Sequence, residues 1–119
     1  MKITIPISVG ELLDKISILE IKSLFTDNEY VIKELDDLNE IKNTITSYTH
    51  EYMEQLREVN QKLWKIEDRL RQLEEEYRFD DEFISLARQV YITNDKRAEI
   101  KRKINEETNS SYQEVKCYV

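Results

Sequence analysis

Two long stretches of the sequence carry apolar residues at alternating spacings of four and three. The first covers residues 52–77 and the second covers residues 79–104. This spacing is typical of helices that pack along one side, as in coiled coils. Because only a short break around Asp80 separates the stretches, they are predicted to form a long antiparallel helical hairpin. The hairpin restricts the chain to a mainly α fold.

The scarcity of turn-forming residues supports the same fold class. Gly10 and Pro6 are the single glycine and proline in 119 residues, so an all-β fold with many tight turns is excluded. Leu, Ile, Val and Phe make up 34 residues, well above the level of about one fifth below which a charged chain stays disordered. We therefore expect one helical domain over residues 1–119.

Several classes of function are excluded by the same composition. The single cysteine, Cys117, cannot form an internal disulfide and suits a reducing compartment. The single histidine, His50, excludes a His-rich metal site and the usual His-based triad. No apolar run approaches the roughly 18 residues of a membrane span, and the first residues do not resemble a signal peptide. The expected location is the cytoplasm, without membrane attachment.

Both ends of the chain alternate between apolar and polar residues. Ile3, Ile5 and Ile7 share one side of residues 2–7, and Val115 and Cys117 share one side of residues 113–118. This period is typical of strands, and a proline within the first segment restricts it to a sheet edge. Because a strand cannot stand alone, the two segments are predicted to form a small β-pair.

The first helix is predicted over residues 9–25. Ser8 and Glu11 have the spacing of a capping box, in which each side chain bonds the backbone of the other residue. Apolar residues lie on most sides of this helix, so Asp14, Ser17 and Glu20 fall between apolar stripes. Such a helix is mostly surrounded by protein, and these polar groups need partners.

The remaining helices are predicted over residues 29–47, 50–77 and 81–108. Residues 44–49 are rich in β-branched and hydroxyl side chains, which are weak helix formers. We therefore expect a break or distortion within this run.

Charge is distributed unevenly along a chain of net charge −7. Residues 27–40 hold six acids and one base, whereas residues 88–103 hold six bases and two acids. These stretches can be solvated faces that attract each other within the fold. Alternatively, the basic stretch can meet a phosphate or an acidic partner. The overall negative charge argues against nucleic acid.

The predicted register gathers polar residues at one height of the bundle. A turn near Arg78 places Asn60 level with Arg97, a polar residue where the helical seam should be apolar. Pairing of the terminal strands then places Asp14 near Lys101 and Glu20 near Asn94 or Asp95. The predicted polar layer contains Asp14, Glu20, Asn60, Trp64, Glu67, Asn94, Asp95, Arg97 and Lys101.

Three interpretations of this layer are open. It can be a buried network that fixes the register of the helices. It can be a pocket in which Arg97 and Lys101 hold an anion beside Trp64. It can also lie at a dimer interface.

The sequence also resembles a family of small uncharacterised bacterial proteins. The family's opening Gly-Glu-Leu-Leu-Asp-Lys-Ile pattern is similar to residues 6–22. Later stretches that resemble it are residues 63–68, 86–91, 93–98 and 114–118. Similar domains are associated with surface-polysaccharide genes and glycosyltransferases, and related sequences occur in phages. The resemblance implies a sugar-pathway setting and no mechanism.

The predicted function is a cytosolic interaction or assembly module that forms a homodimer, with no cofactor and no enzymatic signature. The alternative is a small enzyme or binding domain for a phosphorylated sugar or nucleotide. In that alternative Arg97 and Lys101 hold the anion, and Asp14, Glu20 or Glu67 serve as acid-base groups or Mg²⁺ ligands.

Overall fold

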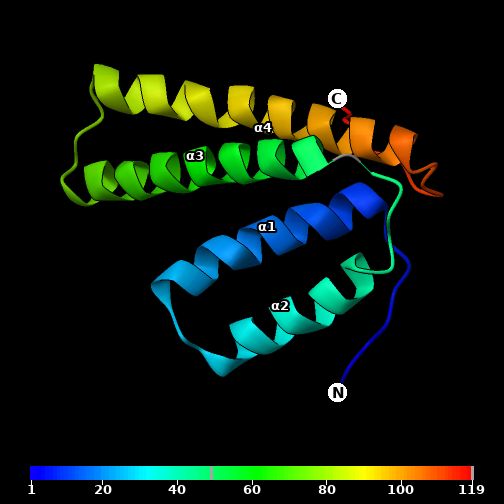
Figure 1. Cartoon of the computed structure of the whole chain (residues 1–119). Helices are drawn as coiled ribbons and strands as arrows, with labels where there is room; N and C mark the ends of the chain where they lie inside the picture. The colour runs from blue at the N-terminus through cyan, green and yellow to red at the C-terminus, as the bar shows by residue number, and fades with distance from the viewer. Residues whose placement is uncertain (49, 119) are drawn as a thin grey trace.

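The computed structural model describes residues 1–48 and 50–118 and has four α-helices in this part of the chain (Figure 1). They are α1 (Val9–Phe25), α2 (Glu29–Lys42), α3 (His50–Glu75) and α4 (Asp81–Glu107). The predicted mainly α class is therefore confirmed. None of these helices has a stretch long and apolar enough to cross a membrane.

Side-chain caps begin α1, α2 and α4. Ser8 Oγ accepts a hydrogen bond from the backbone N–H of Glu11 at 3.1 Å, which gives half of the predicted capping box. Asn28 caps α2 by accepting from Tyr30 N at 2.8 Å, and Asp80 caps α4 by accepting from Phe83 N. Each cap satisfies an N–H group that has no partner within its helix.

The second helix ends five residues earlier than predicted, at Lys42 rather than at residue 47. The hydroxyl of Thr44 donates to Ile41 O at 2.7 Å, a local bond that competes with continued helix. Ile45 and Tyr48 pack against the core from the irregular segment that follows. The predicted break therefore lies within residues 43–48, and Thr49, the last residue of the predicted run, lies outside the described residues.

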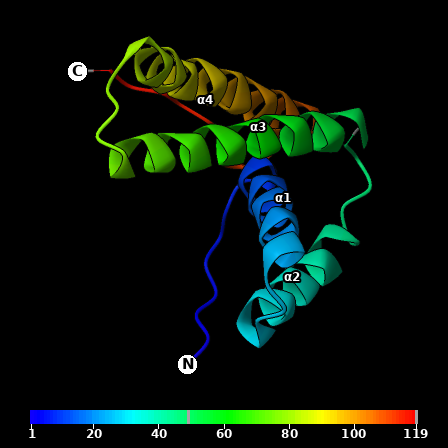
Figure 2. The ribbon, with the colours of Figure 1, turned by 90° about the vertical axis from the view of Figure 1, so that its left-hand side faces the viewer.

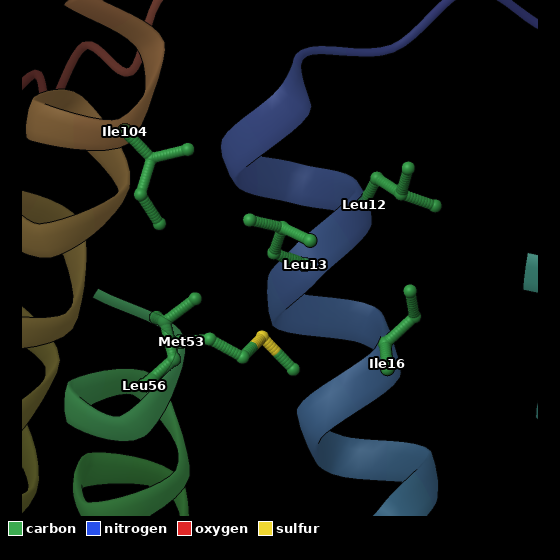
Figure 3. Packing of buried hydrophobic residues seen from close by; sticks show 6 residues of the cluster. All are labelled: Leu12, Leu13, Ile16, Met53, Leu56 and Ile104. Atoms are coloured by element: carbon green, nitrogen blue, oxygen red, sulfur yellow. The ribbon is translucent and has the colours of Figure 1, made fainter. Parts of the chain in front are cut away.

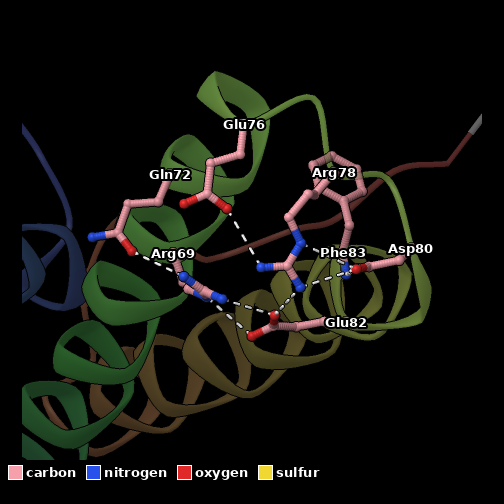
Figure 4. A network of polar contacts seen from close by, with 7 residues as sticks. All are labelled: Arg69, Gln72, Glu76, Arg78, Asp80, Glu82 and Phe83. Atoms are coloured by element: carbon pink, nitrogen blue, oxygen red, sulfur yellow. Dashed lines mark hydrogen bonds and ion pairs between the residues drawn. The ribbon is translucent and has the colours of Figure 1, made fainter.

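A short turn joins α3 to α4, which run in opposite directions (Figure 1) and pack against each other. Tyr77 has a φ of 53°, and Arg78 N donates to Leu73 O at 2.9 Å, the geometry of a helix end closed by a left-handed residue. Arg69 on α3 reaches across to Glu82 on α4 at 2.9 and 3.0 Å (Figure 4). These exposed bonds link α3 to α4 near the turn that joins them.

The hydrophobic core lies where the first half of α1 meets α3 and α4. Its buried side chains come from all three helices (Figure 3): Leu12, Leu13, Ile16, Met53, Leu56 and Ile104. The first helix packs against each of the other three, whereas α2 packs only against α1. Figure 2 shows the α1–α2 pair projecting from the α3–α4 pair. The face of α2 that points away from α1 is therefore not covered by another of the described helices.

The predicted terminal β-pair is wrong, because the described residues contain no strand. Residues 1–7 extend into solvent, with Ile3 and Ile5 exposed at 76% and 67%. The C-terminal segment instead lies against α4, where Lys116 and Tyr118 bind Asp95. Side-chain bonds to a helix therefore replace the backbone pairing that the alternating pattern suggested.

Candidate functional site

The start of α1 makes a close crossing with the end of α4. Gly10 N donates to the side-chain oxygen of Asn105 at 2.7 Å, and Val9 N donates to Ser110 Oγ at 3.2 Å. A Cβ placed on Gly10 would lie 2.7 Å from the backbone oxygen of Lys101. Glycine is therefore required here by the approach of another backbone. This crossing aligns α1 antiparallel to α4, the direction that the sequence argument reached through a β-pair that does not form.

One turn further along α1, a buried carboxylate is held by three helices. Asp14, with an exposed fraction of 1%, receives two bonds from the Arg97 guanidinium of α4, at 2.9 and 2.5 Å. Asn60 of α3 donates to the same carboxylate at 2.9 Å and to Ser17 Oγ at 2.6 Å. Ser17 in turn donates to the backbone oxygen of Asp14. We call Asp14, Ser17, Asn60 and Arg97 the polar centre.

The two charged groups of the polar centre, Asp14 and Arg97, bind each other. The hydrogen bond from Arg97 to Asp14 raises the pKa of the guanidinium, more than burial lowers it. Both carboxylate oxygens of Asp14 already accept bonds from the protein. A buried charge whose lone pairs are occupied in this way stabilises one arrangement of helices and has little capacity left for a ligand.

Lys101 is likewise engaged by acids. Its ammonium lies 2.8 Å from Glu11 and 3.3 Å from Glu114 of the C-terminal segment. Burial lowers the pKa of Lys101, but the bond to Glu11 and the other acids outweigh burial, so the pKa is raised overall. The Glu11 side chain that sequence spacing assigned to the capping box therefore binds α4 instead.

A cleft of about 410 Å³ opens beside the polar centre. Trp64, Glu67 and Asn94 of the predicted layer line it, together with the edge of Arg97. Other lining residues are Ile18, Ile21, Asn60, Leu63, Asp68 and Arg71. The ring of Trp64 stacks on Phe25 of α1, with centroids 5.4 Å apart and planes 6° from parallel. The cleft has an apolar and aromatic wall and a mixed-charge rim.

Two members of the predicted layer lie elsewhere. Glu20 binds Arg57 of α3 through two bonds of 2.8 and 3.1 Å, and does not reach Asn94. Asp95 is exposed and receives the ammonium of Lys116 at 2.7 Å and the hydroxyl of Tyr118 at 2.9 Å. The nine predicted residues are therefore split among the polar centre, the Lys101 ion pairs, the cleft and these two outer contacts.

The Asp95 contact gives a test of how the C-terminal segment is held. Hydrogen bonds from Lys116 and Tyr118 hold the pKa of Asp95 below its ordinary value of 3.8. The contact is therefore present above that pH and is lost as the pH falls through the lowered pKa. At neutral pH, Asp95→Asn should release residues 115–118, which lie beyond the Lys101–Glu114 ion pair, and speed their removal by carboxypeptidase, whereas Glu106→Gln on the same helix should not. Equal digestion rates for all three proteins would contradict this attachment.

Sequence reasoning missed several partners. Ser17 was identified as a polar residue in need of a partner, but not as a bridge to Asn60. Arg57, Glu11 and Glu114 were not assigned to the layer at all. The spacing of Glu20 and Arg57 along separate helices gives no local signal, because their contact depends on how α1 crosses α3. Only the three-dimensional crossing brings them together.

The described residues contain no group of three or more His, Cys, Asp or Glu side chains arranged to hold a metal ion. Within the polar centre the single carboxylate is engaged by its neighbours. Glu67 and Asp68 are exposed on the rim of the cleft. The chemistry of the site is thus that of ion pairs and hydrogen bonds between helices.

The fold and its site define a small helical protein in which the Asp14–Arg97 ion pair joins α1 to α4, and hydrogen bonds from Asn60 join α3 to both. Comparison with protein families identifies the family to which the chain belongs. It belongs to the family of unknown function DUF6165, which matches residues 1–119. This agrees with the expectation of an uncharacterised family. No curated protein and no solved structure matched the chain.

Proposed function

We propose that this protein is an interaction module that assembles with a second copy of itself. The observation that carries the proposal is the solvent-accessible surface area of the protein, which is 8479 Å². A folded monomer of 14.4 kDa is expected to expose about 6,800 Å². The excess of about 1,700 Å², to which the extended residues 1–7 contribute, exceeds the roughly 800 Å² that each partner contributes to an interface of standard size.

The shape of the molecule supports the same proposal. Its radius of gyration is 16.1 Å, whereas a compact chain of this length has about 13.5 Å. The open parts are the extended residues 1–7 and α2, which has no buried residue although it carries apolar side chains. Tyr30, Ile32 and Ile41 are all among its exposed large hydrophobic residues. An amphipathic helix with its outer apolar residues in water is a surface that association would cover.

The alternative, a binding site or enzyme for a phosphorylated sugar or nucleotide, has less support. It requires Arg97 and Lys101 to hold an anion, but Asp14 already binds the first, and Glu11 and Glu114 already bind the second. Thermal shift with nucleotide sugars, sugar phosphates and Mg²⁺ tests this alternative. Because a ligand of the native state raises the apparent stability, an increase in melting temperature would favour the binding site.

Light scattering on the full chain tests the proposed assembly. Over a dilution series from submillimolar to low micromolar protein, we expect the mean molar mass to fall from twice the 14.4 kDa of one chain toward a single chain. A molar mass of one chain throughout the series would contradict the proposal. The cytoplasmic location and the polysaccharide setting stay predictions.

A further inference from the structure

Residues 1–7, which we call the arm, have no backbone partner in the described part of the chain. Ile3 and Ile5 are exposed, and none of the backbone hydrogen bonds among the described residues involves residues 2–7. Figure 2 shows the arm standing apart from the helices. An extended chain whose backbone N–H and C=O groups are open in this way is a template for pairing with another strand.

The arm is complementary to itself when two copies run antiparallel. If the numbers of facing residues sum to 8, Thr4 lies opposite Thr4 of the second copy, and Ile3 lies opposite Ile5. This register pairs the whole arm and places the isoleucines of both copies on one face, because facing residues of antiparallel strands share a face. A register with an odd sum would instead place each isoleucine opposite Lys2, Thr4 or Pro6.

The proline of the arm fits this register. In an antiparallel pair, residues whose N–H and C=O groups point to the other strand alternate with residues whose groups point away. When Ile3 and Ile5 exchange the backbone hydrogen bonds, Pro6 falls at a position that points away, where its missing N–H leaves no bond unmade. Lys2 then lies opposite Pro6 of the second copy, so the two lysines do not face each other.

The helix α2 offers a surface for the apolar face of such a ribbon, which needs a helix or further strands to be stable. Tyr30 and Ile41 are exposed and share one side of α2 with Asp37, at spacings of seven and four residues. The arm of the same chain already reaches this side, because Lys2 lies 3.6 Å from Asp37. Since both of these side chains are largely exposed, their ion pair contributes little stability, and packing of the isoleucines can replace it.

Charge favours the same surface. The acidic stretch, residues 27–40, includes most of α2 and does not contact the basic stretch of α4, because α2 packs only against α1. The arm carries one base, Lys2, and no acid. A ribbon on α2 therefore brings a lysine from each copy to the acidic helices.

We propose that the arms of two copies pair as an antiparallel β-ribbon centred on Thr4, and that the isoleucine face of this ribbon packs on the side of α2 that carries Tyr30 and Ile41. A two-fold axis perpendicular to the ribbon generates both halves of the contact at once, because the same segment pairs with itself. Both α2 helices then lie under the same face of the ribbon. This inference rests on the proposed self-assembly and specifies its surface.

Cysteine crosslinking of the full chain tests the register of the ribbon. In a Cys117→Ser background, Thr4→Cys should form an intermolecular disulfide with oxidised glutathione, because facing Cα atoms at this kind of position lie about 4.5 Å apart, within disulfide range. Lys2→Cys alone should link at least about tenfold more slowly, because the two copies of this residue are about 13 Å apart along the ribbon. An equimolar mixture of Lys2→Cys and Pro6→Cys should link readily again, since these positions face each other. Non-reducing gel electrophoresis measures each rate.

Loss of the isoleucines gives a second readout. Ile3→Ser with Ile5→Ser should weaken self-association by about a hundredfold or more, because four isoleucine side chains then leave the interface. Ile41→Ser, on the surface of α2 that the ribbon covers, should weaken it by about tenfold. The matched control, Ile84→Ser with Ile92→Ser, removes two exposed isoleucines of α4 and should dimerise like the wild type. Circular dichroism should show folded helices in every variant, since these side chains lie outside the core.

The outcomes separate this inference from the proposed function. A wild-type protein that stays monomeric in light scattering overturns both. A wild-type dimer in which Thr4→Cys links no faster than Lys2→Cys, or which tolerates the loss of Ile3 and Ile5, overturns the ribbon and leaves self-assembly standing. A dimer that needs these isoleucines but tolerates Ile41→Ser overturns the placement of the ribbon on α2.

Discussion

Replacing Arg97 by Met is expected to lower the free energy of unfolding by about 3 kcal/mol, the lower end of the range for breaking a buried ion pair. The reason is the Asp14 carboxylate, which is 1% exposed and would keep only its bond from Asn60. The Arg97 side chain is itself 27% exposed, so water offers some compensation at its outer edge. Denaturant unfolding monitored by circular dichroism measures the change.

The matched control is Arg71→Met, which removes a second arginine from the rim of the same cleft. Arg71 is exposed and has no ion pair in the described part of the chain, so its loss should change stability by no more than about 0.5 kcal/mol. The double variant Asp14→Leu with Arg97→Met should lose less stability than the sum of its single variants, because neither charge is then left unpaired. Equal losses for Arg97→Met and Arg71→Met would show that the polar centre does not hold the helices together.

Replacing Gly10 by Ala is expected to lower the free energy of unfolding by about 2 kcal/mol, within the usual range for overpacking. The sign is informative, because alanine favours an ordinary helical position over glycine by about 1 kcal/mol. Here the added Cβ meets the Lys101 backbone oxygen at 2.7 Å, which cannot rotate away as a side chain can. Thermal and denaturant unfolding measure the effect.

An exposed alanine substitution on α3, Glu58→Ala, serves as the control for helix propensity and should be nearly neutral. A Gly10→Ala protein as stable as the wild type, or more stable, would mean that α1 and α4 do not cross as closely as described. If the added methyl group pushes α1 away from α4, the hydrogen bond from Gly10 N to the Asn105 side chain should also weaken.

The helices were predictable because their signals are local. The seam of residues 52–77 and 79–104 and the cap at Ser8 need only neighbours in sequence. The end of α2 was missed by five residues, because the apolar period continued through Ile45 while hydroxyl side chains stopped the helix. The prediction of a terminal β-pair was wrong because its signal is also short and local. Alternation in a segment of six residues indicates an extended chain but does not say what the segment pairs with.

The polar centre was only partly predictable. Arg97 is a polar residue at a seam position, and Asp14 is a polar residue on a surrounded helix, so both were predicted to need partners, and they bind each other. Their direct contact was not foreseen, because the register derived from the absent β-pair placed Asp14 about one turn away, near Lys101. Glu20 and Asp95 have the same chemistry as Asp14 but lie on other sides of their helices. Their side chains therefore find other partners.

The proposed assembly covers the outer face of α2, a helix that has no buried residue in the single chain. Amide hydrogen exchange on the wild-type chain at high and low protein concentration tests this most directly, because protection reports local opening helix by helix. We expect α2 to exchange more slowly in concentrated protein, while the core amides of α3 around Leu56 exchange at nearly the same rate in both. Exchange of α2 that is rapid and independent of concentration would contradict the account.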